Sequence, residues 1–127
     1  MYDKKFWNER YTRDEYLYGT EPNSFLVENF GLLTGPVLSL SEGEGRNAVF
    51  LAGRGLKVRG VDISEVALTK ARALAKSKDV EIQTEVADLS KFKPEKTFYG
   101  SVISISAHLP SAIRYKLYPL VEQCLKP

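Results

Sequence analysis

The chain has 127 residues, of which 43% are hydrophobic and 27% charged, and this composition is typical of one globular domain with a modest core. The net charge of +2 comes from interspersed acidic and basic residues, so the sequence shows no basic block for nucleic acid and no acidic tail. Cys124 is the single cysteine, which excludes an intrachain disulfide and a thiolate cluster, and we expect no metal site.

The N-terminal segment predicts a cytoplasmic protein with no membrane partner. It begins Met-Tyr-Asp-Lys-Lys and has no continuous apolar stretch of the signal-peptide kind. No window approaches the roughly 18 apolar residues of a membrane span. Within residues 1–34 we expect a helix from about Pro22 to Leu33, ended by Gly35-Pro36.

A strand, a glycine-bearing loop, a helix and a second strand are expected between Pro36 and Ser64. The apolar run Val37-Leu38-Ser39-Leu40 predicts the first strand, and Ser41-Glu42-Gly43-Glu44-Gly45 follows it directly. The glycines allow a sharp turn, and Arg46-Asn47 opens the helix, so the loop lies at a positive helix N-terminus. This pattern is typical of the nucleoside-binding half of a doubly wound α/β fold.

The residue that ends the second strand is the first candidate ligand contact. Val58 and Val61 predict that strand, and Asp62 lies at its carboxyl end. A carboxylate at this place accepts hydrogen bonds from the two hydroxyls of a ribose, and capping of a turn or helix is the alternative.

The acidic residues of the loop help to choose the ligand. Glu42 and Glu44 flank the position where a dinucleotide places its pyrophosphate, and carboxylates there repel it. S-adenosylmethionine carries no phosphate and presents a sulfonium and an ammonium cation, so an acidic loop favours it over NAD. The alternative is that both glutamate side chains point to water.

Two further strands, with helices between and after them, are expected in the second half of the chain. Ser64 is a good N-cap for a helix to Lys78, whose basic residues we interpret as its solvated face: Lys70, Arg72, Lys76 and Lys78. Val80 to Val86 predicts the third strand and Val102 to Ile105 the fourth. From Pro110 to Leu125 we expect a helix that Pro119 kinks, or divides into two short helices.

At this point the chain resembles the class I S-adenosylmethionine-dependent methyltransferases, most closely the small tellurite-resistance-type and thiopurine-type enzymes. Five segments in the family's order carry the resemblance, namely Trp7 to Tyr11 with Tyr18 to Asn23, Val37 to Ala48, Gly60 to Ser64, Ala87 to Leu89, and Ser106 to Pro110. The resemblance implies one Rossmann-like domain over residues 1–127, with an N-terminal cap (residues 1–34) and a core over residues 35–127.

The resemblance also implies the site. Asp62 holds the ribose, Ile63 lies against the adenine, Asp88 accepts from the adenine amino group and the Leu89 N–H donates to the ring. Together with these, the cofactor contacts are expected at Ser41, Glu42, Gly43, Gly45, Arg46 and Ser104. Tyr11 and Tyr18 are candidates for a lid or substrate contact, with plain packing as the alternative. His108, the only histidine, is the candidate base, unless it caps the following helix.

Two departures from the family pattern bear on function. Ser39 and Ser41 stand where most members have an acidic residue and a glycine, so we expect Glu42 or Glu44 to replace the acid that faces the methionyl ammonium. The chain also supplies only strands 3, 2, 1 and 4 of the family order, which truncates the sheet after the fourth strand and its following helix. The fourth strand would then be an exposed edge, through which a homo-oligomer is possible.

Three functions remain in competition. The first is methyl transfer from S-adenosylmethionine to a small-molecule acceptor. The second is a non-catalytic nucleoside-binding or regulatory module of the same fold. The third, a nicotinamide-dependent oxidoreductase, is disfavoured by the acidic loop and the N-terminal cap.

Overall fold

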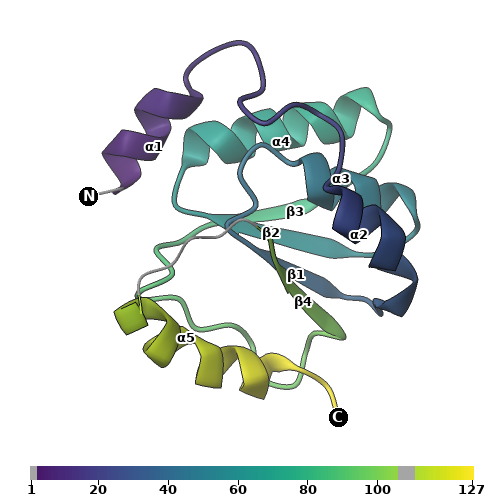
Figure 1. Ribbon diagram of the computed structural model, residues 1–127, viewed down its shortest axis with the longest axis vertical. Coiled ribbons are helices and arrows are strands. Elements are labelled where there is room, and N and C mark those ends of the chain that lie inside the picture. Colours follow the sequence, from purple (N-terminus) through teal and green to yellow (C-terminus); the bar gives the residue numbers. More distant parts are fainter. Residues whose placement is uncertain (1–2, 106–110) are drawn as a thin grey trace.

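The computed structural model describes residues 3–105 and 111–127. Figure 1 shows a central sheet with helices on both of its faces. The elements in chain order are α1 (Lys4–Tyr11), α2 (Ser24–Asn29), the 3-10 helix η1 (Phe30–Leu32), β1 (Val37–Leu40), α3 (Arg46–Gly53), β2 (Val58–Asp62), α4 (Glu65–Ser77), β3 (Gln83–Val86), β4 (Ser101–Ser104) and α5 (Ser111–Cys124).

The sheet of the described residues has four parallel strands in the order β3-β2-β1-β4. Ser39 of β1 pairs with Gly60 of β2 on one side and with Ile103 of β4 on the other. The strand order reverses between β1 and β4, and ligands of open α/β sheets bind at such a point, beyond the carboxyl ends of the strands. The predicted Rossmann-like fold with strands 3, 2, 1 and 4 is confirmed.

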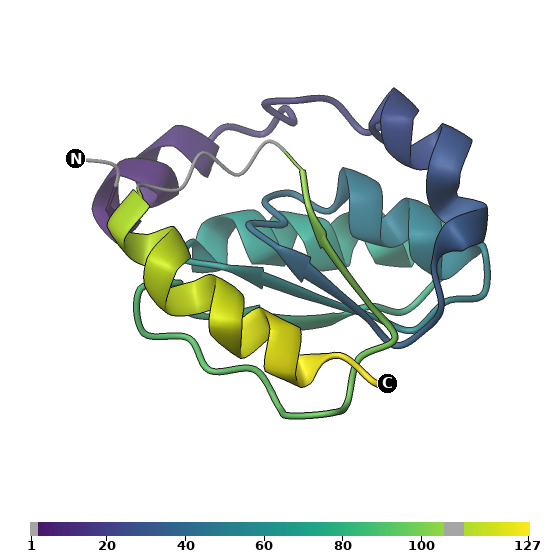
Figure 2. The ribbon, with the colours of Figure 1, turned by 60° about the horizontal axis from the view of Figure 1, so that its bottom comes forward.

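Side chains of the central strand β1 point alternately into two apolar cores, one on each face of the sheet. Leu38 and Leu40 pack with residues of the α5 side, among them Tyr99, Leu117 and Cys124. Val37 instead packs with Leu26 of α2 and with Ala48 and Leu51 of α3. Figure 2 shows α5 on the side of the sheet opposite α3 and α4. A strand buried on both faces explains why β1 is an almost continuous apolar run.

The helix expected from Pro22 to Leu33 is shorter and interrupted. Asn23 caps α2 by accepting a hydrogen bond from the Leu26 N–H at 3.2 Å, so the α-helix begins at Ser24. It ends at Asn29, and the 3-10 turn η1 follows. The third strand is also shorter than predicted, because Val80 and Ile82 pack with Val49, Leu74 and Ala75 before β3 begins.

The last segment forms one continuous helix, so the predicted division into two short helices is wrong. Pro119 lies inside α5. A proline there removes the hydrogen bond to the carbonyl four residues earlier, which belongs to Tyr115. Tyr115 is 85% exposed, so water can bond that carbonyl, while Leu117 and Cys124 keep the helix on the core.

No helix among the described residues has the length and apolar character needed to cross a membrane.

Candidate functional site

The loop between β1 and α3 has the backbone geometry that its glycines predict. We call residues 41–45 the glycine loop; Gly43 and Gly45 have φ angles of +70° and +97°. A Cβ on Gly45 would lie 2.7 Å from the Cβ of Ala71, so glycine is needed both for the turn and for the close packing of α3 on α4. Ser41 also has a positive φ, +54°, which is uncommon for a residue other than glycine.

Asp62 joins the glycine loop to the turn after β2. Its carboxylate accepts a hydrogen bond from the Gly43 N–H at 2.9 Å and another from the Ser64 N–H at 3.0 Å. The side chain is buried, and burial raises its pKa while these hydrogen bonds lower it. Asp62 therefore has the turn-capping role that was the alternative for this position. Each carboxylate oxygen can accept more than one hydrogen bond, so this role leaves capacity for ribose hydroxyls.

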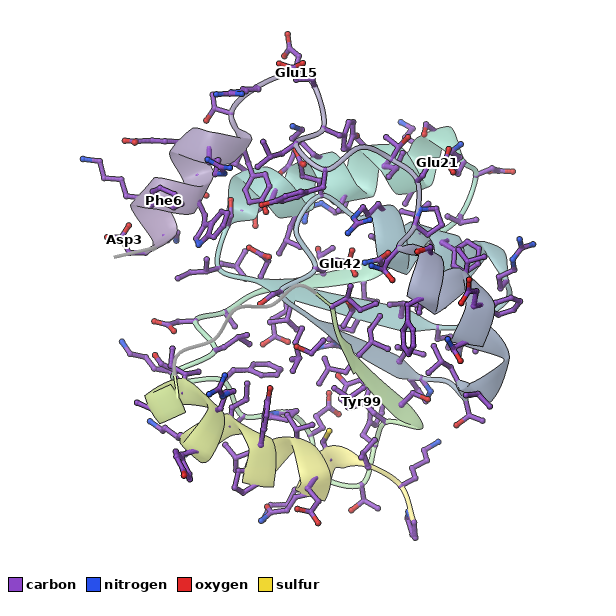
Figure 3. All side chains as sticks on the ribbon, in the orientation of Figure 1. Asp3, Phe6, Glu15, Glu21, Glu42 and Tyr99 are labelled. Atoms are coloured by element: carbon purple, nitrogen blue, oxygen red, sulfur yellow. The ribbon has the colours of Figure 1, made fainter. Side chains whose placement is uncertain are left out.

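Glu42 lies inside the protein, which contradicts the alternative that it points to water. It is 8% exposed, and its Oε1 accepts a hydrogen bond of 2.6 Å from the Ser39 hydroxyl. Its Oε2 is buried without a well-formed hydrogen bond in the described residues, although the Ala48 N–H of α3 lies near enough to the carboxylate to lower its pKa. Burial raises the pKa of Glu42 from 4.5 to about 7. Figure 3 shows Glu42 near the centre of the molecule.

Gly60 provides the space for the Glu42 side chain. A Cβ on Gly60 would lie 2.8 Å from Cγ of Glu42, closer than real Cβ contacts. Gly60 pairs with Ser39 across the sheet. The Glu42 side chain therefore lies over both strands, with its Cγ against Gly60 and its Oε1 bonded to Ser39. Glu42 and Ser39 each stand out in the sequence, but nothing in the pattern predicts the hydrogen bond between them.

Glu44 is also buried, and its partner corrects the interpretation of Lys70 as part of a solvated face. Lys70 of α4 forms an ion pair with the Glu44 carboxylate, and the two side chains are 15% and 4% exposed. The other oxygen of Glu44 accepts a hydrogen bond of 2.7 Å from the Leu17 N–H. Of the two loop acids, Glu44 thus has its charge compensated by a lysine, whereas Glu42 does not.

The N-terminal segment lies over the glycine loop. Tyr11 is buried, and a Cβ on Gly43 would lie 3.2 Å from its hydroxyl oxygen. Burial, with Asp62 nearby, raises the pKa of Tyr11 far above its ordinary value. Trp7 stacks on Tyr11 with ring centroids 5.7 Å apart. Tyr11 therefore lies against the glycine loop, with Trp7 stacked on it.

Three further hydrogen bonds fasten this segment to the same edge. The Ser64 hydroxyl, which also caps α4 as predicted, donates to Oδ1 of Asn8 at 2.6 Å. The Asn23 N–H donates to Oδ1 of Asn47 at 2.8 Å, and Arg46 donates to the Glu21 carbonyl at 3.4 Å. Asn8 and Asn47 both belong to segments of the motif pattern, but an asparagine in such a segment carries no signal that predicts these hydrogen bonds.

The other candidate residues are spread more widely. Leu89 is buried in the core on the α5 side, and Ile63 is half-buried. Asp88 is exposed and accepts from both the N–H and the hydroxyl of Ser90, which lowers its pKa. Tyr18 is 57% exposed, and Ser104 is exposed at the end of β4. His108 lies outside the described residues.

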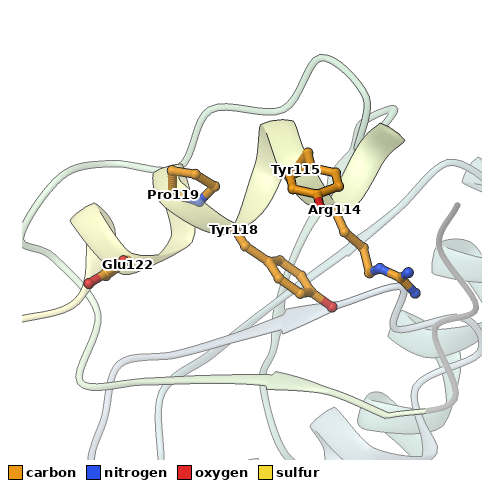
Figure 4. Close-up of a pocket in the computed structure, with 5 residues that line it drawn as sticks. All are labelled: Arg114, Tyr115, Tyr118, Pro119 and Glu122. Carbon is orange, nitrogen blue, oxygen red and sulfur yellow. The ribbon is translucent and has the colours of Figure 1, made fainter. Parts of the chain in front are cut away.

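A separate pocket of about 500 Å³ lies along α5, and none of the described residues that line it belongs to the glycine loop (Figure 4). The described residues that line it all belong to α5, namely Arg114, Tyr115, Tyr118, Pro119 and Glu122. Among the described residues, no group of three or more histidine, cysteine, aspartate or glutamate side chains is arranged to hold a metal ion.

Comparison with known proteins gives a family. The model of the methyltransferase domain family matches residues 37–127, which is more than half of the chain. No curated protein matches the chain significantly.

Solved structures agree with this match. An S-adenosylmethionine-dependent methyltransferase from Mesorhizobium loti is 28% identical with a TM-score of 0.65, over 75% of this chain and 44% of that chain. The magnesium protoporphyrin IX methyltransferase of Synechocystis PCC 6803, solved with bound S-adenosylhomocysteine, is 26% identical with a TM-score of 0.61, over 76% of this chain and 47% of that one.

A third structure shows how far the fold extends. It comes from work on the conversion of a disulfide bond into a thioacetal group during echinomycin biosynthesis, and its TM-score is 0.84 over 98% of this chain and 56% of that chain. Its 24% identity indicates the fold alone. The chain spans about half the length of these three neighbours.

Proposed function

The chain belongs to the methyltransferase domain family, in its class I S-adenosylmethionine-dependent form, and from that premise we propose that it takes part in methyl transfer to a small-molecule acceptor. S-adenosylmethionine is the cofactor of this domain. The observation that carries the proposal is the glycine loop, where the buried carboxyl group of Glu42 has no basic side chain paired with it among the described residues and therefore suits a cation and disfavours a pyrophosphate.

The residues present fit this cofactor. Asp62 lies at the carboxyl end of β2 with capacity to accept from a ribose, and half-buried Ile63, which follows it, is the residue proposed to lie against an adenine ring. Glu42 Oε2 is a buried acceptor that has no well-formed hydrogen bond in the described residues, and an ammonium group would satisfy it. We therefore assign to Glu42, rather than to the lysine-paired Glu44, the replacement of the strand acid.

When bound, S-adenosylmethionine supplies a methyl group activated by its sulfonium. The task of the protein is to hold the acceptor in line with that methyl group and to exclude water. Asp62 orients the ribose end, and Tyr11 with the rest of the N-terminal segment covers the loop from solvent. A soft acceptor such as a thiol or a metalloid needs no base, whereas a hydroxyl or amine acceptor needs His108 or another base to remove a proton.

The tellurite-resistance and thiopurine subgroup stays part of the proposal. Its support is the N-terminal segment that lies over the loop, the place where these small enzymes carry a cap, and the acceptors of that subgroup would be metalloid oxyanions and thiols. A small-molecule partner, without nucleic acid or membrane, is consistent with the mixed charge of the chain.

The test is isothermal titration of the chain with S-adenosylhomocysteine, with NADH titrated in parallel. We expect micromolar binding of S-adenosylhomocysteine alone. Asp62→Asn should weaken that binding at least about tenfold, since a neutral amide is a poorer acceptor for two hydroxyls. Binding of NADH alone would contradict the proposal.

Turnover is tested separately, by methyl transfer to a panel of thiols, metalloid oxyanions and small hydroxylated acceptors. Cofactor binding without transfer to any of them would favour the non-catalytic module. The observation that supports a non-catalytic module is Ser39, which stands in place of the acid that usually ends the first strand.

A further inference from the structure

We propose that Lys70 is a positioning residue that latches a strap over the glycine loop, and that release of this latch admits and discharges the cofactor. The strap comprises residues 12–23, between α1 and α2. The gating part of the inference rests on the proposed function, whereas the latch itself is a property of the chain without ligand.

The ammonium group of Lys70 holds the strap directly. It donates to the carbonyl oxygen of Arg13 at 2.7 Å and to that of Glu15 at 2.6 Å. Its Nζ also lies 4.9 Å from the centre of the Tyr16 ring, and the Tyr16 hydroxyl donates to the Lys70 carbonyl at 3.0 Å. One lysine of α4 thus contacts three successive parts of the strap.

The same ammonium group is tied to the glycine loop. Lys70 pairs with Glu44, and the second oxygen of Glu44 accepts from the Leu17 N–H of the strap. Loop, α4 and strap therefore meet at one ion pair that is largely removed from water. Removing one partner of such a pair leaves the other charge buried and unpaired, which is costly.

The strap has one apolar contact of its own, since half-buried Tyr16 packs against Val49, Leu74 and Ala75, and its other fastenings are polar. With so little apolar contact, the polar latch has a large share in keeping the strap closed. None of its side chains is fully buried, and those of residues 12–15 and 18–21 are exposed. Figure 3 shows Glu15 at the outer rim of the molecule. Further anchors lie at its two ends, in buried Tyr11 before it and in the hydrogen bond between Asn23 and Asn47 at its far end. Segments held by few apolar contacts open locally at low free-energy cost.

Opening would be useful because the closed strap covers the proposed cofactor loop. The Leu17 backbone bonds to Glu44, and Tyr11 lies against Gly43. A ligand seated on this loop lies beneath these groups, so its exchange requires them to move. Gly19, with a φ of +76° and no neighbour within 4 Å of a Cβ position, is suited to be the hinge.

The first experiment needs no ligand and compares Lys70→Met with a matched control, Lys76→Met, an exposed lysine on the same helix. Chymotrypsin reports on the strap because Tyr16, Leu17 and Tyr18 are its cleavage sites there. Trp7, the only tryptophan, reports on α1 through acrylamide quenching. We expect Lys70→Met to speed cleavage in the strap about tenfold, Lys76→Met to leave it unchanged, and Lys70→Arg to restore most of the protection.

The second experiment measures association and dissociation of S-adenosylhomocysteine on the immobilised full chain. A latch predicts that both rate constants rise in Lys70→Met, whereas a merely structural role would lower affinity without faster association. Cleavage and rate constants equal to those of Lys76→Met would overturn the proposal.

If the wild-type chain binds no S-adenosylhomocysteine, the proposed function and the gating fail together. The cleavage rates without ligand then still show whether Lys70 holds the strap closed. If Lys70→Met does not fold, Glu44→Gln provides the same comparison, since it removes the charge and keeps the acceptor for Leu17.

Discussion

At the scale of single residues, the feature most particular to this chain is the carboxylate of Glu42. Its place is set by three neighbours that the sequence pattern does not connect: the Ser39 hydroxyl bonds it, Gly60 makes room for it, and the N-terminal turn of α3 lies above it. A carboxylate near a helix N-terminus is stabilised by the helix dipole, but here burial outweighs that effect and raises its pKa.

This pKa gives the domain a dependence of stability on pH. The pKa of Glu42 rises from 4.5 to about 7 on folding, so the ionised form is disfavoured in the folded state. The resulting penalty is absent below pH 4.5, grows as the pH rises through 4.5 to 7, and is fully present above 7. Glu42→Gln keeps an acceptor for Ser39 and should raise the free energy of unfolding at pH 8 by up to about 3 kcal/mol, with little effect at pH 4. Urea titrations at both pH values measure this, and an equal effect at both would contradict it.

We expect Gly60 not to tolerate a larger side chain, because Glu42 occupies the space beside it. Gly60→Ala should lower the free energy of unfolding by about 1–3 kcal/mol, since its Cβ would lie 2.8 Å from Cγ of Glu42. In a Glu42→Ala background the same change should cost less, because the nearest atom, Cγ, is gone and only the Cβ of residue 42, at 3.0 Å, remains close. The double-mutant cycle is measured by chemical unfolding. Additive costs would mean that Gly60 is needed for some other reason.

At the scale of secondary structure, the sequence predicts best where local signals agree. Ser64 as N-cap, the apolar run of β1 and the glycines before α3 each determine an element by nearby residues, and the structure has these elements where they were expected. The failures have a common cause. Lys70 on α4 and Pro119 in α5 depend on contacts with distant segments, which a single helix pattern does not contain.

Pro119 offers the test of this explanation. If packing of Leu117 and Cys124 holds α5 together despite the proline, Pro119→Ala restores the lost hydrogen bond to Tyr115 and should raise the free energy of unfolding by about 1–3 kcal/mol. Thermal unfolding followed by circular dichroism measures the change. Gln123→Ala, at another exposed position of α5, is the control for helix propensity alone. A Pro119→Ala variant no more stable than wild type would show that the unbonded carbonyl costs nothing.

At the scale of the whole molecule, the strand order was predicted from the family resemblance, and the location of the site at the carboxyl edge from the motifs and that order. The contacts by which the N-terminal segment covers that edge could not be predicted from the motifs. Asn8, Tyr11 and Leu17 reach the loops after β1 and β2 across long stretches of chain, and nothing in their local sequence specifies these partners. The N-terminal segment was predicted as a cap by resemblance alone. Its bonds to Ser64 and Glu44 show the physical means by which such a segment is held.

The free edge of β4 is the remaining feature at this scale. Among the described residues β4 pairs only with β1, so its other side presents unpaired backbone groups, which favour pairing with a second copy. We expect light scattering to give a mass above the 14.3 kDa of one chain, which falls on dilution. Ser104→Lys, at the exposed end of β4, should weaken this association, because an edge lysine opposes strand pairing. Ser77→Lys adds the same charge on α4, away from the edge, and should leave the mass unchanged. A strictly monomeric wild type, or equal loss of association in both variants, would show that β4 is not the contact.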